Sequence, residues 1–262
     1  MDPEESADGS DADASAPSLL AERLQDVGVC LALGAGGFAC YLLWAVLLLN
    51  VATAFVGEVQ EVHIVLVSPP ALGLGMVSAA ALYVHVSRDD WSFVDVRLPG
   101  LRDAGYAVGG VVVLVGLAWS IDILLQQVGV TAADHGTIET LERVDPWVTL
   151  YLVVASIVFI GPGEELLFRN LVQKRLAGSF PATGAIALAS VIFALVHFEA
   201  YSTGTATQRL VSLTVVFTLS VVLGWLYHRT ENLVVVAVVH GVYNAILFAL
   251  VYVETVSAAS GA

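Results

Sequence analysis

Charged residues are scarce in this chain of 262 residues: only 13% are Asp, Glu, Lys or Arg. Soluble globular domains carry about 25% charged residues. Lys174 is the only lysine in the sequence. Lys and Arg together number ten, against 24 Asp and Glu residues. A basic surface for nucleic acid cannot be built from this composition, and we expect no nucleic-acid partner. The shortage of charge also argues against a soluble domain.

Cysteine is nearly absent as well. Cys30 and Cys40 are the only two, and they lie ten residues apart in one apolar run. Along a helix that separation is about 15 Å, which is too long for a disulfide. We therefore expect two small buried side chains that say nothing about the cellular compartment.

Apolar residues dominate the composition. They make up 58% of the chain, and the mean hydropathy is +0.84. Runs long enough for transmembrane helices recur without an internal repeat. The sequence therefore predicts an all-α polytopic bundle of about seven transmembrane helices in the cell membrane, with the lipid bilayer as its partner. The runs cover residues 29–56, 62–86, 105–129, 147–163, 183–198, 210–227 and 232–253.

The N-terminal segment has a different composition. Residues 1–18 carry six acidic residues among Ser, Ala and Gly, and no basic residue. Such a segment cannot bury enough apolar surface to order itself. We expect a disordered acidic tail over 1–18, followed by one transmembrane helical domain over 19–255. The acid-rich, lysine-poor composition also suggests a host with an acidic proteome and a high internal salt concentration.

The basic residues predict the orientation of the bundle. Short cytoplasmic loops are enriched in Lys and Arg. If the N-terminus is cytoplasmic, eight basic residues lie on the inner side and only two on the outer side. The N-terminus is therefore expected in the cytoplasm. The inner set is Arg23, Arg88, Arg97, Arg102, Arg169, Lys174, Arg175 and Arg229, and the outer set is Arg143 and Arg209.

Ionisable side chains inside transmembrane segments are costly and mark functional sites by default. The first group lies in the segment IGPGEELLFRN. Glu165 and Arg169 are four residues apart, so they share a helix face and can form an ion pair. Glu164 points to a different side of the helix and stays available for chemistry.

Two histidines can lie at the depth of Glu164. The turn signal GSFP predicts a chain reversal near Phe180, with Glu164 16 residues before it and His197 17 residues after it. In an antiparallel helical hairpin the two side chains then lie at the same height, about 24 Å from the turn. This requires the fourth helix to continue to about residue 177. His240 lies about 12 Å into the last helix, with Asn244 one turn further on the same face.

A carboxylate, two imidazoles and an amide at one depth suit amide hydrolysis. A Glu–His pair can hold a water molecule and remove its proton during attack on a carbonyl carbon. A second His and an Asn can donate hydrogen bonds to the oxyanion. The motifs HExxH and GxSxG are absent from the sequence. We expect no required cofactor, with zinc bound by Glu164, His197 and His240 as the alternative.

Three motifs in order on successive membrane helices resemble a known family. They are Glu164-Glu165-x-x-x-Arg169, Phe193-x-x-x-His197 and His240-x-x-x-Asn244. This pattern is similar to the CPBP family, the CAAX-prenyl-protease and bacteriocin-processing intramembrane endopeptidases, over a motif-bearing core of residues 147–250.

The resemblance implies a role for each motif residue. Glu164 would be the general base and His197 its partner on the attacking water, while His240 and Asn244 would stabilise the oxyanion. Arg169, paired with Glu165, would hold the geometry, and Phe193 belongs to the second motif as a supporting residue. The implied substrate is a membrane-associated protein or peptide, including prenylated CAAX proteins.

Two other classes of function stay open. A non-catalytic membrane protein that binds or shields a partner, as an immunity protein does, could carry the same motifs. A proton-coupled transporter could use the same buried acids and histidines, although no repeat or paired broken helices favour it.

Overall fold

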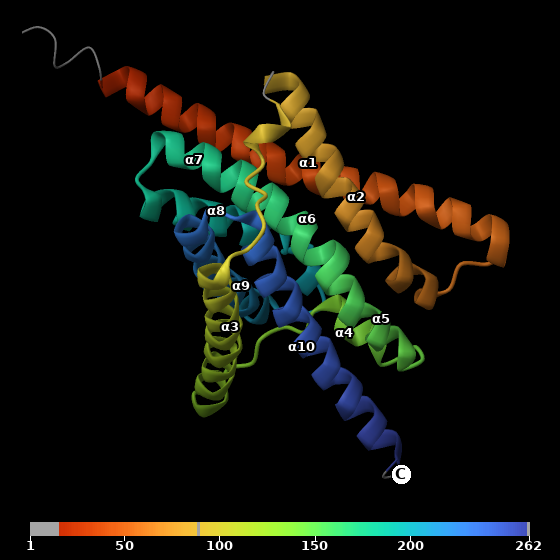
Figure 1. Ribbon diagram of the computed structural model, residues 1–262. Coiled ribbons are helices and arrows are strands. Elements are labelled where there is room, and N and C mark those ends of the chain that lie inside the picture. The colour runs from red at the N-terminus through yellow and green to blue at the C-terminus, as the bar shows by residue number, and fades with distance from the viewer. Residues whose placement is uncertain (1–15, 88–89, 261–262) are drawn as a thin grey trace, which may run out of the picture.

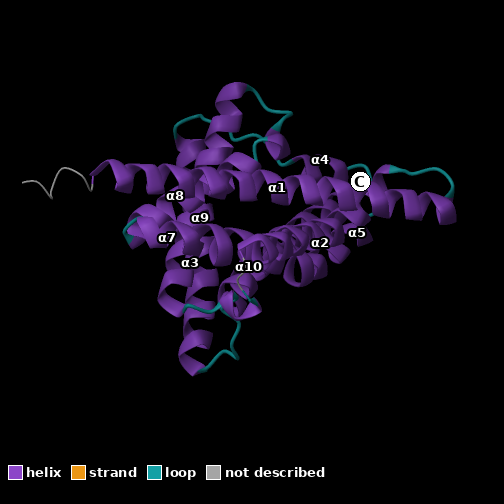
Figure 2. Ribbon diagram, turned by 90° about the horizontal axis from the view of Figure 1, so that it is seen from above, coloured by secondary structure: helices purple, strands orange, loops and turns teal. Residues whose placement is uncertain are grey.

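In the computed structural model, residues 16–87 and 90–260 are described, and this part of the chain consists of helices and loops without strands (Figures 1 and 2). The acidic segment predicted to be disordered lies mostly outside these residues, and the first helix already begins at Ala16. The elements are α1 (Ala16–Val56), α2 (Glu61–Ser87), η1 (Trp91–Phe93), α3 (Leu101–Gln127), α4 (Gly136–Leu141), α5 (Trp147–Ala155), η2 (Ser156–Ile160), α6 (Gly161–Glu165), η3 (Leu166–Gln173), α7 (Lys174–Ser179), α8 (Ala182–Val196), η4 (Glu199–Tyr201), α9 (Ala206–Thr230) and α10 (Leu233–Ser260).

The helical membrane bundle predicted from the sequence is confirmed. Six helical stretches of the described chain are long and apolar enough to cross a membrane. The remaining apolar helix, α8, has only 15 residues. At 1.5 Å per residue it is about 22 Å long, less than the roughly 30 Å hydrocarbon core. The fifth apolar run therefore gives a helix that ends inside the bundle, and its last turn leads directly to His197.

The fourth spanning stretch is continuous from Trp147 to Ser179. It passes through α5, η2, α6, η3 and α7, as the spacing argument required, and α8 begins three residues after its end. Two of its parts, η2 and η3, are π-helical. Pro162 has no N–H to donate to a carbonyl in the preceding turn, and the chain widens into η2 immediately before Gly161. We call the stretch Trp147–Ser179 the central helix.

The central helix lies in the middle of the bundle, between α2 on one side and α10 on the other (Figure 1). Its η3 segment is buried over all eight residues. The antiparallel pair α1 and α2 covers one side, α8 packs between α1 and α9, and α3 packs against α9 and α10. The core is formed by η3 side chains together with residues of α2, α8, α9 and α10.

The bundle has two distinguishable ends. At the α7 end, Arg175 pairs with Asp26 and Lys174 pairs with Asp95, each at 2.8 Å. At the α4 end, Arg143 of the α4–α5 connection pairs with Glu61 at the start of α2. One basic residue assigned from the sequence to the inner loops, Arg169, is fully buried in the core instead. It is therefore not a loop charge, and the inner set shrinks to seven.

Candidate active site

The centre of the site is a buried series of ionisable side chains in contact, which connects the central helix with α10. Arg169 Nε donates a hydrogen bond to Glu165 Oε2 at 2.9 Å, so the pair that the four-residue spacing predicted is present. The other oxygen, Glu165 Oε1, lies 2.7 Å from His240 Nδ1. Glu165 and Arg169 are completely shielded from solvent, and His240 is 6% exposed. Glu165 therefore fixes the orientation of the His240 ring as well as that of Arg169.

Glu164 faces the same ring from the other side. Its Oε2 lies 3.7 Å from His240 Nε2, beyond hydrogen-bond distance, and it has no hydrogen-bond partner in the described chain. Nδ1 of the ring is occupied by Glu165, so Nε2 and the Glu164 carboxylate face one another across a short gap. This leaves the Glu164 carboxylate free to act on a substrate or a water molecule.

Glycines allow α6 and α10 to approach closely enough for this contact. A Cβ added to Gly161 would lie 2.5 Å from the carbonyl oxygen of Ala237, and one added to Gly241 would lie 2.8 Å from the backbone of Ile157. Any side chain at either position would therefore force the two helices apart. Glu164, Glu165 and His240 come together because this crossing is made of backbone against backbone.

The second motif reaches the same place from α8. The Phe193 ring packs edge-on to the His240 ring, with 6.1 Å between the ring centres. The Arg169 guanidinium lies over the Phe193 ring, 5.3 Å from the centre of that ring. One turn later, His197 packs on Phe193 at 4.5 Å, and its Nδ1 lies 2.8 Å from the Phe193 carbonyl oxygen. A carbonyl only accepts, so Nδ1 carries the proton and Nε2 of a neutral His197 is an acceptor.

The third motif is only partly brought together. Asn244 lies one turn beyond His240 on α10, so it shares that helix face. Its side chain is half-buried. Within the described residues, its amide group forms no hydrogen bond. His197 and Glu164 form no ion pair there either, and His240 is the imidazole in contact with Glu164.

A short segment at the α4 end packs against the turn that follows His197. His135 accepts a hydrogen bond from the backbone N–H of Thr137 and packs edge-on against Tyr201 at 5.4 Å. Burial, with the nearby His197, lowers the pKa of His135 to about 4. Burial also raises the pKa of Tyr201 to about 12. Both side chains are thus neutral at pH 7 and add no charge beside the turn that follows His197.

The segment before α3 is anchored to the end of η3. Asn170, directly after Arg169, accepts a hydrogen bond from the Asp95 backbone N–H at 2.9 Å, and Tyr227 of α9 donates to both residues. Lys174 Nζ donates to the Phe93 carbonyl oxygen at 2.7 Å. These contacts fix η3 from the α7 end, and nothing in the sequence pattern predicted them.

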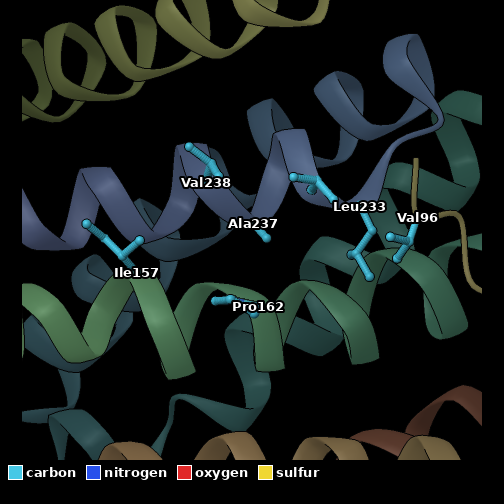
Figure 3. A pocket seen from close by; sticks show the side chains of 7 residues that line it. Val96, Ile157, Pro162, Leu233, Ala237 and Val238 are labelled. Atoms are coloured by element: carbon cyan, nitrogen blue, oxygen red, sulfur yellow. The ribbon is translucent and has the colours of Figure 1, made fainter. Parts of the chain in front are cut away.

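An apolar groove of about 220 Å³ runs along the seam between the central helix and α10. Figure 3 shows Pro162 on one wall and Leu233, Ala237 and Val238 on the other, with Val96 closing one end. No charged residue lines it, and neither Glu164 nor His240 contributes to it. The groove is thus an apolar surface next to the helix turns that carry Glu164 and His240, and no polar side chain of the described residues lines it.

A metal site was the alternative predicted for Glu164, His197 and His240. In the described part of the chain, no group of three His, Cys, Asp or Glu side chains is placed to hold a metal ion. His240 Nδ1 is bound to Glu165 at 2.7 Å, and its Nε2 lies 3.7 Å from Glu164 Oε2. In this arrangement the three residues are not preorganised as zinc ligands.

A comparison with family models identifies part of the chain. Residues 146–246 match the model described as type II CAAX prenyl endopeptidase Rce1-like. No curated protein and no solved structure matches the chain. The match covers the central helix, α8, α9 and the part of α10 that carries His240 and Asn244. The resemblance to the CPBP family is thus confirmed, and residues 146–246 form an Rce1-like domain of the type II CAAX prenyl endopeptidase family.

Proposed function

We propose that this membrane protein is a glutamate-dependent intramembrane endopeptidase that hydrolyses peptide bonds of membrane-associated substrates. One observation carries the proposal. A buried carboxylate without a hydrogen bond at Oε2 in the described chain, Glu164, lies 3.7 Å from a histidine that a second carboxylate holds in place. A buried ionisable group is costly and persists in membrane proteins where it has a function.

The proposed reaction begins with a water molecule between Glu164 and His197. His197 Nε2 accepts a hydrogen bond from this water, and Glu164 takes its proton as the oxygen bonds to the carbonyl carbon. His240 donates to the oxyanion that forms through Nε2–H, as an imidazolium whose Nδ1–H is donated to Glu165, and the Asn244 amide donates beside it. The C–N bond then breaks, and Glu164 returns its proton to the leaving amine. Phe193 supports both imidazole rings through its ring contacts.

Glu165 and Arg169 have a different role in this proposal. Glu165 touches His240 and Arg169 but faces no open space, because it is completely buried. It orients the His240 ring, as a carboxylate does behind a catalytic histidine. Water activation needs no metal in this scheme, and the cofactor requirement is part of the test below.

The substrate class follows from the family match and the site's surroundings. The matched family is named for CAAX prenyl endopeptidases. An apolar groove between the central helix and α10 lies next to the turns that carry Glu164 and His240. We propose a lipid-modified protein or peptide, with prenylated CAAX proteins as the first class to test. By the basic residues at the α7 end, that end faces the cytoplasm of a cell-membrane protein, with the N-terminus on the same side.

The test compares purified wild type with Glu164→Gln in one detergent. The probes are a farnesylated peptide ending in a CAAX sequence, the same peptide without the lipid, and a broad peptide mixture. Metal content is measured in the active sample, and Glu254→Gln, an exposed glutamate near the end of α10, is the matched control. We expect Glu164→Gln to lose at least about a hundredfold in rate, whereas Glu254→Gln stays at the wild-type rate.

The outcomes separate the alternatives. Full activity in Glu164→Gln contradicts a glutamate-dependent mechanism. Stoichiometric zinc in the active enzyme, with activity lost on chelation, replaces the metal-free scheme. No cleavage of any probe by the wild type favours a non-catalytic partner-binding protein, and proton-dependent flux in vesicles favours a transporter.

A further inference from the structure

Arg169 is held from a helix that carries none of the three motifs. Its Nη2 donates a hydrogen bond to the hydroxyl of Ser220 on α9 at 2.9 Å, 51 residues away along the chain. Ser220 is 1% exposed and Arg169 is completely buried. The guanidinium is therefore fixed at two nitrogens, by Glu165 on its own helix and by Ser220 on a neighbouring one.

One turn further on α9, Gly224 allows this approach. A Cβ at position 224 would lie 2.7 Å from Gln173 Oε1 and 3.6 Å from Arg169 Nη1. The Gly224 carbonyl oxygen accepts a hydrogen bond from Gln173 Nε2 at 2.9 Å. Ser220 and Gly224 therefore form one contact surface of α9, which we call the α9 anchor, and it receives two successive turns of η3.

The α9 anchor is connected to the proposed catalytic groups by an unbroken series of short contacts. Ser220 holds Arg169, Arg169 holds Glu165 at 2.9 Å, and Glu165 lies 2.7 Å from His240 Nδ1. The series crosses three helices, from α9 through the central helix to α10. A change in the Arg169 rotamer would therefore move the Glu165 carboxylate and, with it, the His240 ring.

Within the described residues, Arg169 already has one guanidinium nitrogen without a hydrogen bond, besides the one that Ser220 binds. Its Nη1 is buried without a hydrogen-bond partner in the described chain. Loss of the Ser220 hydroxyl would leave Nη2 unpaired as well, and a buried unpaired donor drives its side chain toward another acceptor. The buried acceptors around it in the described chain are Glu165 and the unpaired Gln173 Oε1. A turn of the guanidinium toward either one would change the Arg169–Glu165 pair and, with it, the Glu165–His240 contact.

We propose that Ser220 is a positioning residue of the active site, which orients His240 through Arg169 and Glu165, with Gly224 providing the space for the contact. This inference rests on the proposed peptidase function. It adds a residue outside all three motifs, on a helix that carries none of them.

The test uses Ser220→Ala, Ser220→Thr and Ser190→Ala in the full-length protein. Ser220→Thr keeps the hydroxyl. Ser190 on α8 is the matched control, because it is a fully buried serine whose hydroxyl has no hydrogen-bond partner in the described residues. kcat, KM and the pH profile of kcat are measured with the substrate that the wild type cleaves. Thermal unfolding checks that each variant folds.

We expect Ser220→Ala to lower kcat about ten- to a hundredfold with little change in KM, because small misplacements of reacting groups have costs of this size. Its pH profile should shift, Ser220→Thr should recover most of the rate, and Ser190→Ala should match wild type. Unchanged kcat and pH profile in Ser220→Ala overturn the proposal. An equal loss in Ser190→Ala also overturns it, because the effect would then be general packing.

A second measurement does not need activity. The His240 ring resonances are assigned with His240→Gln and titrated by NMR in wild type, Ser220→Ala and Ser190→Ala. A shifted His240 titration in Ser220→Ala alone supports the positioning role even if no probe is cleaved. An unchanged titration overturns it. Absence of cleavage by the wild type, with Glu164→Gln equally inactive, counts against the peptidase function only.

Discussion

The two neighbouring glutamates of the first motif have opposite environments. Glu165 has a partner at each oxygen, Arg169 at Oε2 and His240 at Oε1. Glu164 Oε2 has no hydrogen-bond partner in the described chain, and its contact with His240 Nε2 is 3.7 Å long. Buried ion pairs contribute little net stability, but removal of one partner leaves an uncompensated charge that destabilises strongly. Glu165 thus holds the site together, and Glu164 is the residue to which our proposal assigns the chemistry.

Substitution of Glu165 should lower the free energy of unfolding more than substitution of Glu164. Glu165→Gln keeps the size of the side chain but leaves Arg169 charged and buried, and we expect a loss of about 3–5 kcal/mol in the free energy of unfolding. Glu164→Gln should change it by less than about 1 kcal/mol, because no ion pair with a permanently charged group is broken. Unfolding in mixed micelles with increasing SDS measures both. Equal losses in the two variants would contradict the division of roles.

Among the helices, the crossing of α6 with α10 decides the geometry of the site. The crossing lies directly after the π-helical segment η2, and a second π segment, η3, follows Glu165. π-helical turns occur frequently at functional sites. The contact itself depends on Gly161 and Gly241, whose Cα atoms face the partner backbone without a side chain between them.

A methyl group at this crossing should disrupt the site. Gly241→Ala places a Cβ 2.8 Å from the backbone of Ile157, which cannot move without displacing the helix. We expect a loss of about 1–3 kcal/mol in the free energy of unfolding, together with loss of peptidase activity as His240 moves away from Glu164.

The matched control is Gly109→Ala on α3, where an added Cβ meets no atom within 4 Å. Alanine is favoured over glycine inside a helix by up to about 1 kcal/mol. We therefore expect Gly109→Ala to keep or slightly increase stability and to keep activity. If both alanine variants behave alike, helix propensity rather than the close crossing explains the result.

For the whole molecule, the unequal distribution of charge between the two ends predicts its orientation. Lys174 and Arg175 lie at the α7 end, whereas Arg143 lies at the α4 end. Cytoplasmic loops collect Lys and Arg. The proposed site then lies within the membrane, and the His135–Tyr201 ring contact lies on its α4 side.

Cysteine labelling tests this orientation. Leu98→Cys is placed in the exposed segment before α3, and Glu58→Cys in the α1–α2 connection, in a chain whose Cys30 and Cys40 are replaced by alanine. An impermeant maleimide added to intact cells should label Glu58→Cys at once and Leu98→Cys only after permeabilisation. The reverse pattern would show that the α7 end faces outward.

The sequence by itself determined the helical membrane class, the approximate helix ranges, the Glu165–Arg169 ion pair and the family. These features depend on local properties: the length of apolar runs, a four-residue spacing on one helix face, and the order of short motifs. The depth argument that connected Glu164 with His197 used only the rise per residue of two helices and the turn at Phe180. It correctly required the fourth helix to continue past residue 163.

Only the tertiary structure decided which groups touch. Nothing in the sequence indicated that Glu165 is shared between Arg169 and His240, that α8 ends inside the bundle, or that Ser220 holds Arg169. The Glu165–His240 and Arg169–Ser220 contacts join residues 75 and 51 positions apart, and they depend on how closely the helices approach. That approach is set by glycines whose role becomes visible only when the opposing backbone is in place. Local patterns fix what each helix can offer, and the packing of helices against one another determines which of those groups meet.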